Sequence, residues 1–528
     1  MSENIRQAIQ AGKTALGIEL GSTRIKAVLI GEDHSPIASG SFDWENRLEN
    51  GVWTYHMDEV WQGIQGCYRA MKEDVQAKYG VTLKGIGAIG MSAMMHGYLP
   101  FSQEGKQLAA FRTWRNTITG QASQELTQLF GFNIPQRWSI AHLYQAVRSK
   151  EPHVNKIAHI TTLAGYVHYM LTGVNAVGIG EGSGIFPVDS EKLCYDGEML
   201  EKFQYLLSGR GLPWKIRDLL PALRLAGEPC GTLTEEGAKR LGGLLRPGTP
   251  FCPPEGDAET GMTATNAVAP RTGNVSAGTS IFSMVVLERP LKKVYPEIGI
   301  VTTPTGRPVA MVHCANCTGD MNAWLGLFRE TLALFGAEPD RDEFFSCLYR
   351  LSLQGAADCG GVMVCNYLSG ESVTHTNEGR PMVLRKPGAD FSLANFLRAQ
   401  LYSAVATLSI GMRLLREEGV RIDSLTGHGG LFKTPLVGQR YLASACGVPV
   451  TCMKTAGEGG PYGMALLAAY MVRKERGESL EDYLDKKVFA GVESTVTVPE
   501  IECARGVKEY IKNFEACLRV EREAIKAF

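Results

Sequence analysis

Two short turns in the sequence combine glycine with hydroxyl residues, a pattern that suits contact with phosphate groups. Gly21-Ser22-Thr23 joins the β-rich runs LGIEL and IKAVLI, and Gly278-Thr279-Ser280 joins two similar runs later in the chain. Glycine lets the backbone approach an anion closely, while successive N–H groups and hydroxyls donate hydrogen bonds to its oxygens. A single turn of this kind is an ordinary connection. The pair predicts two loops that together hold a triphosphate.

Two other motifs imitate nucleotide-binding fingerprints but lack the required context. GIGAIG at 85–90 has the G-x-G-x-x-G spacing that normally lies between a strand and a helix. Here Ile86, Ile89 and Met91 alternate with small residues, as in a packed strand, and MSAMMHG does not begin a helix. AGKT at 11–14 resembles the end of a P-loop, but Gln7 stands where the first glycine is needed. We expect neither nicotinamide binding nor a P-loop.

One cluster of metal-binding residue types also deserves a test against its spacing. His313, Cys314 and Cys317 in VHCANC resemble half of a zinc site, but a structural site needs four ligands and no second close pair follows. The 13 cysteines are scattered, and an odd number cannot all form disulfides. Reduced thiols and a cytoplasmic location are therefore expected.

The elements that must position the two turns follow a repeated plan. Residues 14–44 read as two strands around the first turn and a third strand, PIASGSF, after a polar turn; residues 272–290 repeat the strand-turn-strand part. The two strand-turn-strand elements are separated by about half the chain length. Such a duplication predicts two related α/β halves with ligands in the cleft between them. The alternative is that any two hairpins look alike.

Helical patterns separate and follow these strands. Apolar residues recur on one face of 58–80, and 159–173 reads as a second helix. Residues 424–452 read as strand, glycine turn, helix and strand, and a glycine-rich segment precedes the apolar helix at 464–472. The end of the chain, from ECARG onward, reads as a charged amphipathic helix. We expect the domain boundary in PGTPFCPPEGDAETG, 247–261.

Composition excludes several classes of function. Lys and Arg total 54 against 55 for Asp and Glu, so no net positive field favours a nucleic acid or an acidic membrane. The N-terminus has no signal-peptide pattern, and no apolar run is long enough to span a bilayer. With 528 residues, of which 44% are hydrophobic, the chain is expected to form at least two domains with sizeable cores.

Together these features resemble the FGGY family of carbohydrate kinases, within the actin-like ATPase superfamily, and the likeness runs along nearly the whole chain. GIELGSTRIKAVLI is similar to the family's first phosphate loop, SAGTS to its second, and GGLFKTPLVGQ at 429–439 to its adenosine-binding segment. MMHG at 94–97, YLSGE at 367–371 and the EPHVNKIAHI...YMLTG arrangement point toward the xylulokinase-like branch. The order of the motifs, more than any one of them, carries the resemblance.

The resemblance implies an α/β fold of two ribonuclease H-like (actin-like ATPase) domains with an interdomain active-site cleft. Residues 1–262 would form the N-terminal sugar-binding domain, and 263–528 the C-terminal nucleotide-binding domain with its C-terminal helix. The implied activity is ATP-dependent phosphorylation of a sugar hydroxyl, with a ketopentose such as xylulose as acceptor and with ATP and Mg²⁺ as cofactors. The expected partners are this sugar and ATP, without nucleic acid or membrane, and a homodimer is one option for the oligomeric state.

The resemblance also assigns roles to individual residues. Asp257 matches the family's G-D catalytic aspartate and would deprotonate the attacking hydroxyl, although a Gly-Asp turn beside prolines could be structural. The metal would lie near Glu19 and Asp257. The sugar would contact Met95, His96, Trp114, Arg115, Asn116 and Asp257, the alternative for His96 being a satisfied buried histidine. ATP would contact Gly21, Ser22, Thr23, Lys26, Gly278, Thr279, Ser280, Gly429, Gly430 and Lys433.

Two departures from the family pattern bear on the site. Glu19 stands where the family usually has Asp, which keeps the charge but adds one methylene. The sugar loop, usually W-x-D-x-R, reads Trp114-Arg115-Asn116-Thr117-Ile118 and lacks both the acid and the later arginine. The identity of the sugar therefore stays open, and another ketose or a polyol is an alternative. An actin-like ATPase with a regulatory or assembly role and no sugar turnover is the alternative from another class.

Overall fold

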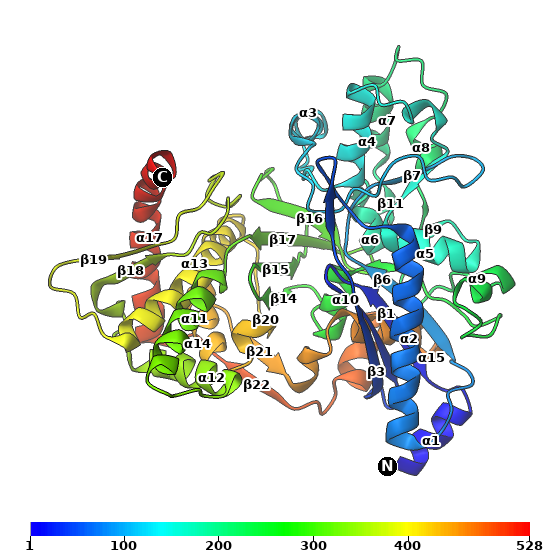
Figure 1. Ribbon diagram of the computed structural model, residues 1–528. Coiled ribbons are helices and arrows are strands. Elements are labelled where there is room, and N and C mark those ends of the chain that lie inside the picture. Colours follow the sequence, from blue (N-terminus) through cyan, green and yellow to red (C-terminus); the bar gives the residue numbers. More distant parts are fainter. Residues whose placement is uncertain (1) are drawn as a thin grey trace. The chain divides into compact units, whose positions relative to one another are not determined.

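The structure is a computed structural model that describes residues 2–528. The chain forms two compact units that interleave along the sequence. Unit 1 contains the residues up to 268 together with 300–309 and 458–491, and unit 2 contains 269–299, 310–457 and 492–528. Helices and strands alternate in both units (Figure 1), which confirms the expected α/β class.

The sheet of unit 1 has the strand order β13-β6-β1-β2-β3. β1 (Ala15–Leu20), β2 (Arg24–Ile30) and β3 (Pro36–Asp43) form an antiparallel meander, while β6 (Ala88–Ala93) and β13 (Glu255–Gly256) run parallel to β1. All residues of β6 are buried, as in a strand covered on both faces. The carboxyl ends of β1, β6 and β13 therefore meet at one edge of the sheet.

Three helices of unit 1 pack against this sheet. α2 (Met57–Tyr79) buries Val60, Ile64 and Met71 and ends at Gly80 in the left-handed conformation. α10 (Asp257–Ala264) starts directly after β13, and α15 (Gly460–Arg473) packs against β1, β6 and α10. The sheet is thus covered by helices from distant parts of the sequence.

Smaller elements complete unit 1. They are α1 (Ser2–Gln10), β4 (Arg47–Glu49), β5 (Val52–Thr54), β7 (Leu99–Phe101), α3 (Gly120–Phe130), α4 (Ser139–Arg148), β8 (His159–Thr161), α5 (Leu163–Thr172), β9 (Ala176–Gly178), α6 (Ile179–Ser183), β10 (Val188–Asp189), β11 (Cys194–Tyr195), α7 (Gly197–Leu206), α8 (Ile216–Leu219), β12 (Ala222–Arg224), α9 (Glu235–Arg240) and α16 (Leu480–Tyr483).

The second sheet repeats the plan with the order β16-β17-β15-β14-β20-β21-β22. β14 (Thr272–Ala277) pairs antiparallel with β15 (Ile281–Val286) and parallel with β20 (Ser424–His428), which in turn pairs parallel with β21 (Val450–Met453). The predicted duplication of the strand-turn-strand element is therefore confirmed. The other elements are β16 (Ile298–Thr302), β17 (Pro308–Cys314), α11 (Gly319–Leu334), α12 (Arg341–Leu351), β18 (Val362–Cys365), β19 (Met382–Arg385), α13 (Leu393–Glu417), α14 (Val437–Cys446), β22 (Ser494–Thr497) and α17 (Ile501–Ala527).

Two segments differ from the sequence-based expectation. The stretch 247–261, where the domain boundary was expected, lies within unit 1, which continues to residue 268. Ile89 N–H donates to Pro250 O and Cys252 N–H to Ile89 O, so the middle of the stretch extends the sheet beside β6 and its end begins α10. The helix expected at 159–173 begins only at Leu163, because Thr162 caps it by accepting from Gly165 N–H, and the preceding residues form β8.

GIGAIG enters strand β6, and no helix follows it directly. Gly90 packs against α15, since a Cβ there would lie 2.8 Å from Met464 Cγ and 2.9 Å from Cys252 Sγ. The glycines of this motif therefore serve close packing inside the sheet. Among residues 2–528, no helix has both the length and the hydropathy needed to cross a membrane.

Candidate active site

Three residues predicted to act on the sugar and the metal converge at the carboxyl edge of the unit 1 sheet. Glu19 is the penultimate residue of β1, Met95 follows β6, and Asp257 follows β13. Met95 N–H donates to Asp257 Oδ1 at 3.0 Å, which ties the end of β6 to the start of α10. The topology thus brings together groups that lie far apart in the sequence.

Asp257 is the first residue of α10 and is open to solvent. The surrounding protein nevertheless displaces enough water to raise the pKa of Asp257, and hydrogen bonds from the Met95 and Ala258 N–H groups oppose this shift. A fixed carboxylate with raised basicity and access from solvent is suited to accept a proton from a bound hydroxyl.

Glu19 lies beside Asp257 and is half-buried. Desolvation, followed by repulsion from Asp257, raises the pKa of Glu19 to about 8, against the attraction of Lys26. Lys26 faces Glu19 across the β1–β2 pair. Two neighbouring carboxylates with one lysine create a site that a divalent cation would stabilise.

The first glycine-hydroxyl turn is held from behind by aromatic residues. Trp44 Nε1 donates to Gly21 O at 2.7 Å, Tyr55 Oη to Ser22 O at 2.5 Å, and the Trp44 backbone N–H to Thr23 O at 3.2 Å. The Trp44 and Tyr55 rings stack with centroids 4.2 Å apart. Within residues 2–528 the N–H groups of Ser22 and Thr23 have no partner, so this turn retains donors for an anion.

Met95 and His96 occupy the turn after β6. Both are buried, and His96 adopts a left-handed backbone with φ 73°, which is unusual for a residue other than glycine. The His96 ring stacks on Trp138 at 6.1 Å between centroids, and a Cβ at Gly184 would lie 2.5 Å from its Nδ1. The turn therefore holds His96 in a tightly enclosed position beside Met95 and the Asp257 carboxylate.

Of the three sugar-loop residues, Trp114 and Arg115 are exposed and Asn116 is buried. Trp114 Nε1 donates to Ser22 Oγ at 3.2 Å, and the Arg115 guanidinium stacks on the Trp53 ring at 4.0 Å. Asn116 is 2% exposed, accepts from Trp53 N–H, and donates to Trp53 O and Thr113 O. Both amide hydrogens of Asn116 are thus used inside the protein.

Three buried glutamates beneath Asp257 were missed by the motif-based prediction. Glu181, Glu255 and Glu259 are at most 1% exposed, and Glu181 N–H donates to Glu255 Oε2 at 2.8 Å. Desolvation, with repulsion among the three, raises the pKa of each well above its usual range. The acidic residues in EGDAE were a local signal, but their burial depends on the whole unit. Burial and mutual repulsion therefore favour the protonated form of these carboxyl groups.

The predicted nucleotide residues of unit 2 also lie near one another. Gly278 N–H donates to Ser280 O at 2.8 Å, and Thr318 Oγ1 donates to Gly278 O at 2.7 Å. Gly429 has φ 100° and packs so closely on Ala277 that any Cβ would overlap the Ala277 carbonyl. The second glycine-hydroxyl turn and the Gly429-Gly430 segment thus form one surface, near which Lys433 is exposed.

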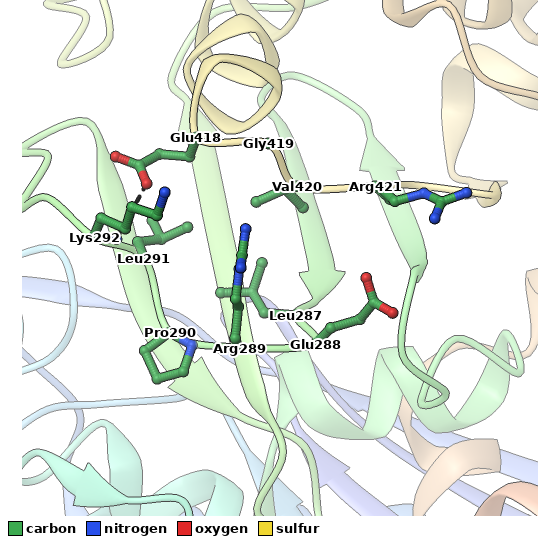
Figure 2. A pocket seen from close by; sticks show the side chains of 10 residues that line it. All are labelled: Leu287, Glu288, Arg289, Pro290, Leu291, Lys292, Glu418, Gly419, Val420 and Arg421. Carbon is green, nitrogen blue, oxygen red and sulfur yellow. Dashed lines mark hydrogen bonds between the residues drawn. The ribbon is translucent and has the colours of Figure 1, made fainter.

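One small cavity of unit 2 lies apart from these residues. Figure 2 shows it between the segment 287–292 and the segment 418–421. Its volume is about 20 Å³. Glu418 accepts from Lys292 N–H at 3.1 Å and from Tyr295 Oη at 2.7 Å, so this contact fastens the two segments together. No candidate residue lines the cavity, and its size suits a water molecule better than a substrate.

Comparison with known proteins accounts for both units. Residues 14–263 match the N-terminal domain, and residues 273–472 the C-terminal domain, of the FGGY family of carbohydrate kinases. The xylulose kinase of Escherichia coli is 25% identical over 485 residues, covering 87% of this chain and 90% of the relative.

Solved structures show the same fold at lower identity. The xylulose kinase of Rhodospirillum rubrum superposes with a TM-score of 0.77 at 16% identity, covering 96% of this chain and 98% of its own. The gluconate kinase of Lactobacillus acidophilus gives 0.77 at 16% identity, with 95% and 96% covered. These likenesses confirm the expected two-domain, actin-like fold.

Proposed function

The chain belongs to the FGGY family of carbohydrate kinases, and on this premise we propose that it phosphorylates a ketopentose such as xylulose. As a carbohydrate kinase it is a phosphotransferase that uses ATP as the donor. The similarity to a xylulose kinase along most of the chain supports this acceptor. The finer assignment rests on the residues at the carboxyl edge of the unit 1 sheet.

The observation that carries the proposal is the position of Asp257 at the end of β13, hydrogen-bonded to Met95 N–H and open to solvent. Asp257 accepts the proton of the acceptor hydroxyl while the hydroxyl oxygen attacks the γ-phosphorus of ATP. The bond between the γ-phosphorus and the bridging oxygen breaks, and ADP leaves. Met95 and His96 hold the sugar so that its hydroxyl faces this carboxylate.

Glu19 and Asp257 fit the requirements of Mg²⁺, which proteins usually bind through one or two carboxylates together with substrate phosphates. Their mutual repulsion, one cause of the raised pKa of Glu19, would be relieved by a divalent cation. When bound, Mg²⁺ would supply positive charge to the phosphate oxygens. In the described residues no group of three or more His, Cys, Asp or Glu is arranged to hold a metal, so the nucleotide would complete the coordination.

The nucleotide contacts are divided between two loops. We assign the N–H groups and hydroxyls of Ser22 and Thr23 to phosphate oxygens, together with Gly21 and Lys26. In unit 2, Gly278, Thr279 and Ser280 take the same role, and Gly429, Gly430 and Lys433 contact the adenosine. On this assignment residues 1–262 mainly bind the sugar and residues 263–528 mainly bind the nucleotide.

The sugar loop is assigned with one change from the family pattern. Trp114 and Arg115, which are exposed, are proposed as sugar contacts, whereas Asn116 fixes the β4–β5 hairpin through the Trp53 backbone. The position that usually carries an acid thus acts indirectly here. Acceptor preference consequently depends on Trp114 and Arg115.

The test is a measurement of ADP release from ATP and Mg²⁺ with a panel of acceptors: xylulose, other ketoses, polyols and gluconate. A ketopentose should give the highest kcat/KM and a stoichiometric sugar phosphate. Preference for a polyol or for gluconate would refute the proposed acceptor. ATP hydrolysis that no acceptor stimulates would instead favour an ATPase without sugar turnover.

A further inference from the structure

The glycine-rich segment GEGGPYG at 457–463 leads into helix α15, and its role is not explained by the motifs. α15 packs against β1, which carries Glu19, and against α10, which begins with Asp257. The segment therefore reaches the candidate active site from a distant part of the sequence, and from Glu458 onward it belongs to unit 1.

Two glycine contacts fix α15 against these elements. Gly17 of β1 faces α15 so closely that a Cβ would overlap Pro461 O and Ala465 N. Gly463 of α15 faces α10 in the same way, since its Cβ would overlap the Thr260 carbonyl oxygen. Backbone atoms lie on both sides of these contacts, so α15 has little freedom to move away from either element.

A third contact involves Glu19 itself. A Cβ at Gly460, the first residue of α15, would overlap Glu19 Oε2 and would lie 2.8 Å from both Glu19 Cδ and Thr260 Oγ1. The end of the Glu19 side chain thus occupies the space that a side chain at position 460 would need. An aspartate at position 19 would end about 1.5 Å earlier, the length of one carbon–carbon bond.

We propose that Gly460 is a positioning residue for Glu19, and that the two form a matched pair in which glycine at 460 makes room for the extra methylene of glutamate at 19. The pair lets the longer carboxylate stay at the carboxyl edge of the sheet beside Asp257. This inference rests on the role assigned to Glu19 under the proposed function.

The test is a double-mutant cycle of Gly460→Ala and Glu19→Asp, read by kcat, by the KM for sugar and by the melting temperature without nucleotide. Gly460→Ala should lower kcat about 100-fold, the loss that follows when an active-site group is displaced by about 1 Å, with little change in the KM for sugar. In the Glu19→Asp background the same change should alter kcat by less than about 3-fold, because the overlap with Glu19 is gone and only the contact with Thr260 Oγ1, common to both backgrounds, remains. The melting temperature should show the same non-additivity.

Two other glycines provide matched controls. Gly457→Ala places its Cβ in open space and should leave kcat and the melting temperature unchanged. Gly463→Ala meets the Thr260 backbone, so its loss of stability should not be rescued by Glu19→Asp. If Gly460→Ala does not fold, the double variant must fold for the pairing to stand.

The outcomes separate the pairing from the function. Equal losses from Gly460→Ala in both backgrounds, or no loss in the wild-type background, would overturn the matched pair. Full turnover by Glu19→Gln would instead refute the metal-binding role of Glu19. In that case a non-additive melting temperature would still show that positions 19 and 460 are in contact.

Discussion

Replacing Asp257 by asparagine tests the proposed base with the least structural disturbance. The asparagine Oδ1 can still accept from Met95 N–H, which Asp257 accepts at 3.0 Å. The change removes the negative charge that helps to raise the pKa of Glu19, so the neighbouring carboxylate should ionise more easily. The fold should therefore survive, with a change in stability of about 1 kcal/mol or less, as for one conserved hydrogen bond.

Turnover should respond far more strongly than stability. A positioned general base contributes about 100-fold to 10,000-fold, which corresponds to about 2.7 to 5.4 kcal/mol of activation free energy. Because phosphoryl transfer passes through a loose transition state with little need for a strong base, the loss should lie near the lower end of this range. The KM values for ATP and sugar should change little.

The assay is steady-state ADP release with the preferred acceptor, after circular dichroism and ATP-induced stabilisation have shown that the variant is folded. Asp218→Asn is the matched control, since Asp218 is an exposed aspartate in α8, a helix of the same unit that carries no proposed active-site residue. A folded Asp257→Asn enzyme that turns over at close to the wild-type rate would show that Asp257 is not the base.

Four further measurements test other parts of the site. Tyr55→Phe removes the hydrogen bond to Ser22 O and keeps the ring stack with Trp44. The KM for ATP should rise severalfold, and the KM for sugar should stay unchanged. The control Tyr79→Phe loses a similar bond to the Ile37 carbonyl of β3 and should change neither KM. His96→Ala should weaken sugar use and leave ATP affinity nearly intact, and loss of ATP binding by a folded variant would place His96 elsewhere. ATP with Mg²⁺ at 100 times its Kd should stabilise the protein by about 2.7 kcal/mol, whereas stabilisation by NAD alone would contradict the assignment. A carboxyl group whose pKa is raised by folding contributes stability below its unfolded pKa, near 4.5, and this stability is lost as the pH rises through the folded pKa. Glu181→Gln removes one such group, so its free energy of unfolding in urea should fall less than that of wild type as the pH is raised above 4.5, and equal falls would refute the buried titration.

Much of the fold could be predicted from the sequence because its signals are local. The β-rich runs on both sides of Gly21 and Gly278 have the alternation and turn residues of hairpins, and both hairpins occur in the structure. The order of the motifs led to the FGGY family, and with it to the two-domain fold. The rejection of GIGAIG as a dinucleotide motif also depended only on adjacent residues.

The chain does not locally encode the partners of its polar side chains. Asn116 was expected at the sugar because its loop resembles the family's, but nothing in that loop indicates that its amide also bonds to the backbone of Trp53, which is distant in sequence. The three buried glutamates could be seen as acidic letters, but their burial depends on how α6, β13 and α10 pack.

The sequence is enough to predict the helices and strands, their order and the family, whereas the contacts between distant side chains depend on the tertiary structure. The overlap between Glu19 and a Cβ at Gly460 shows the difference, because the two residues lie near opposite ends of the chain. Secondary structure follows from spacing over a few residues, whereas close contact depends on the packing of whole helices against a sheet.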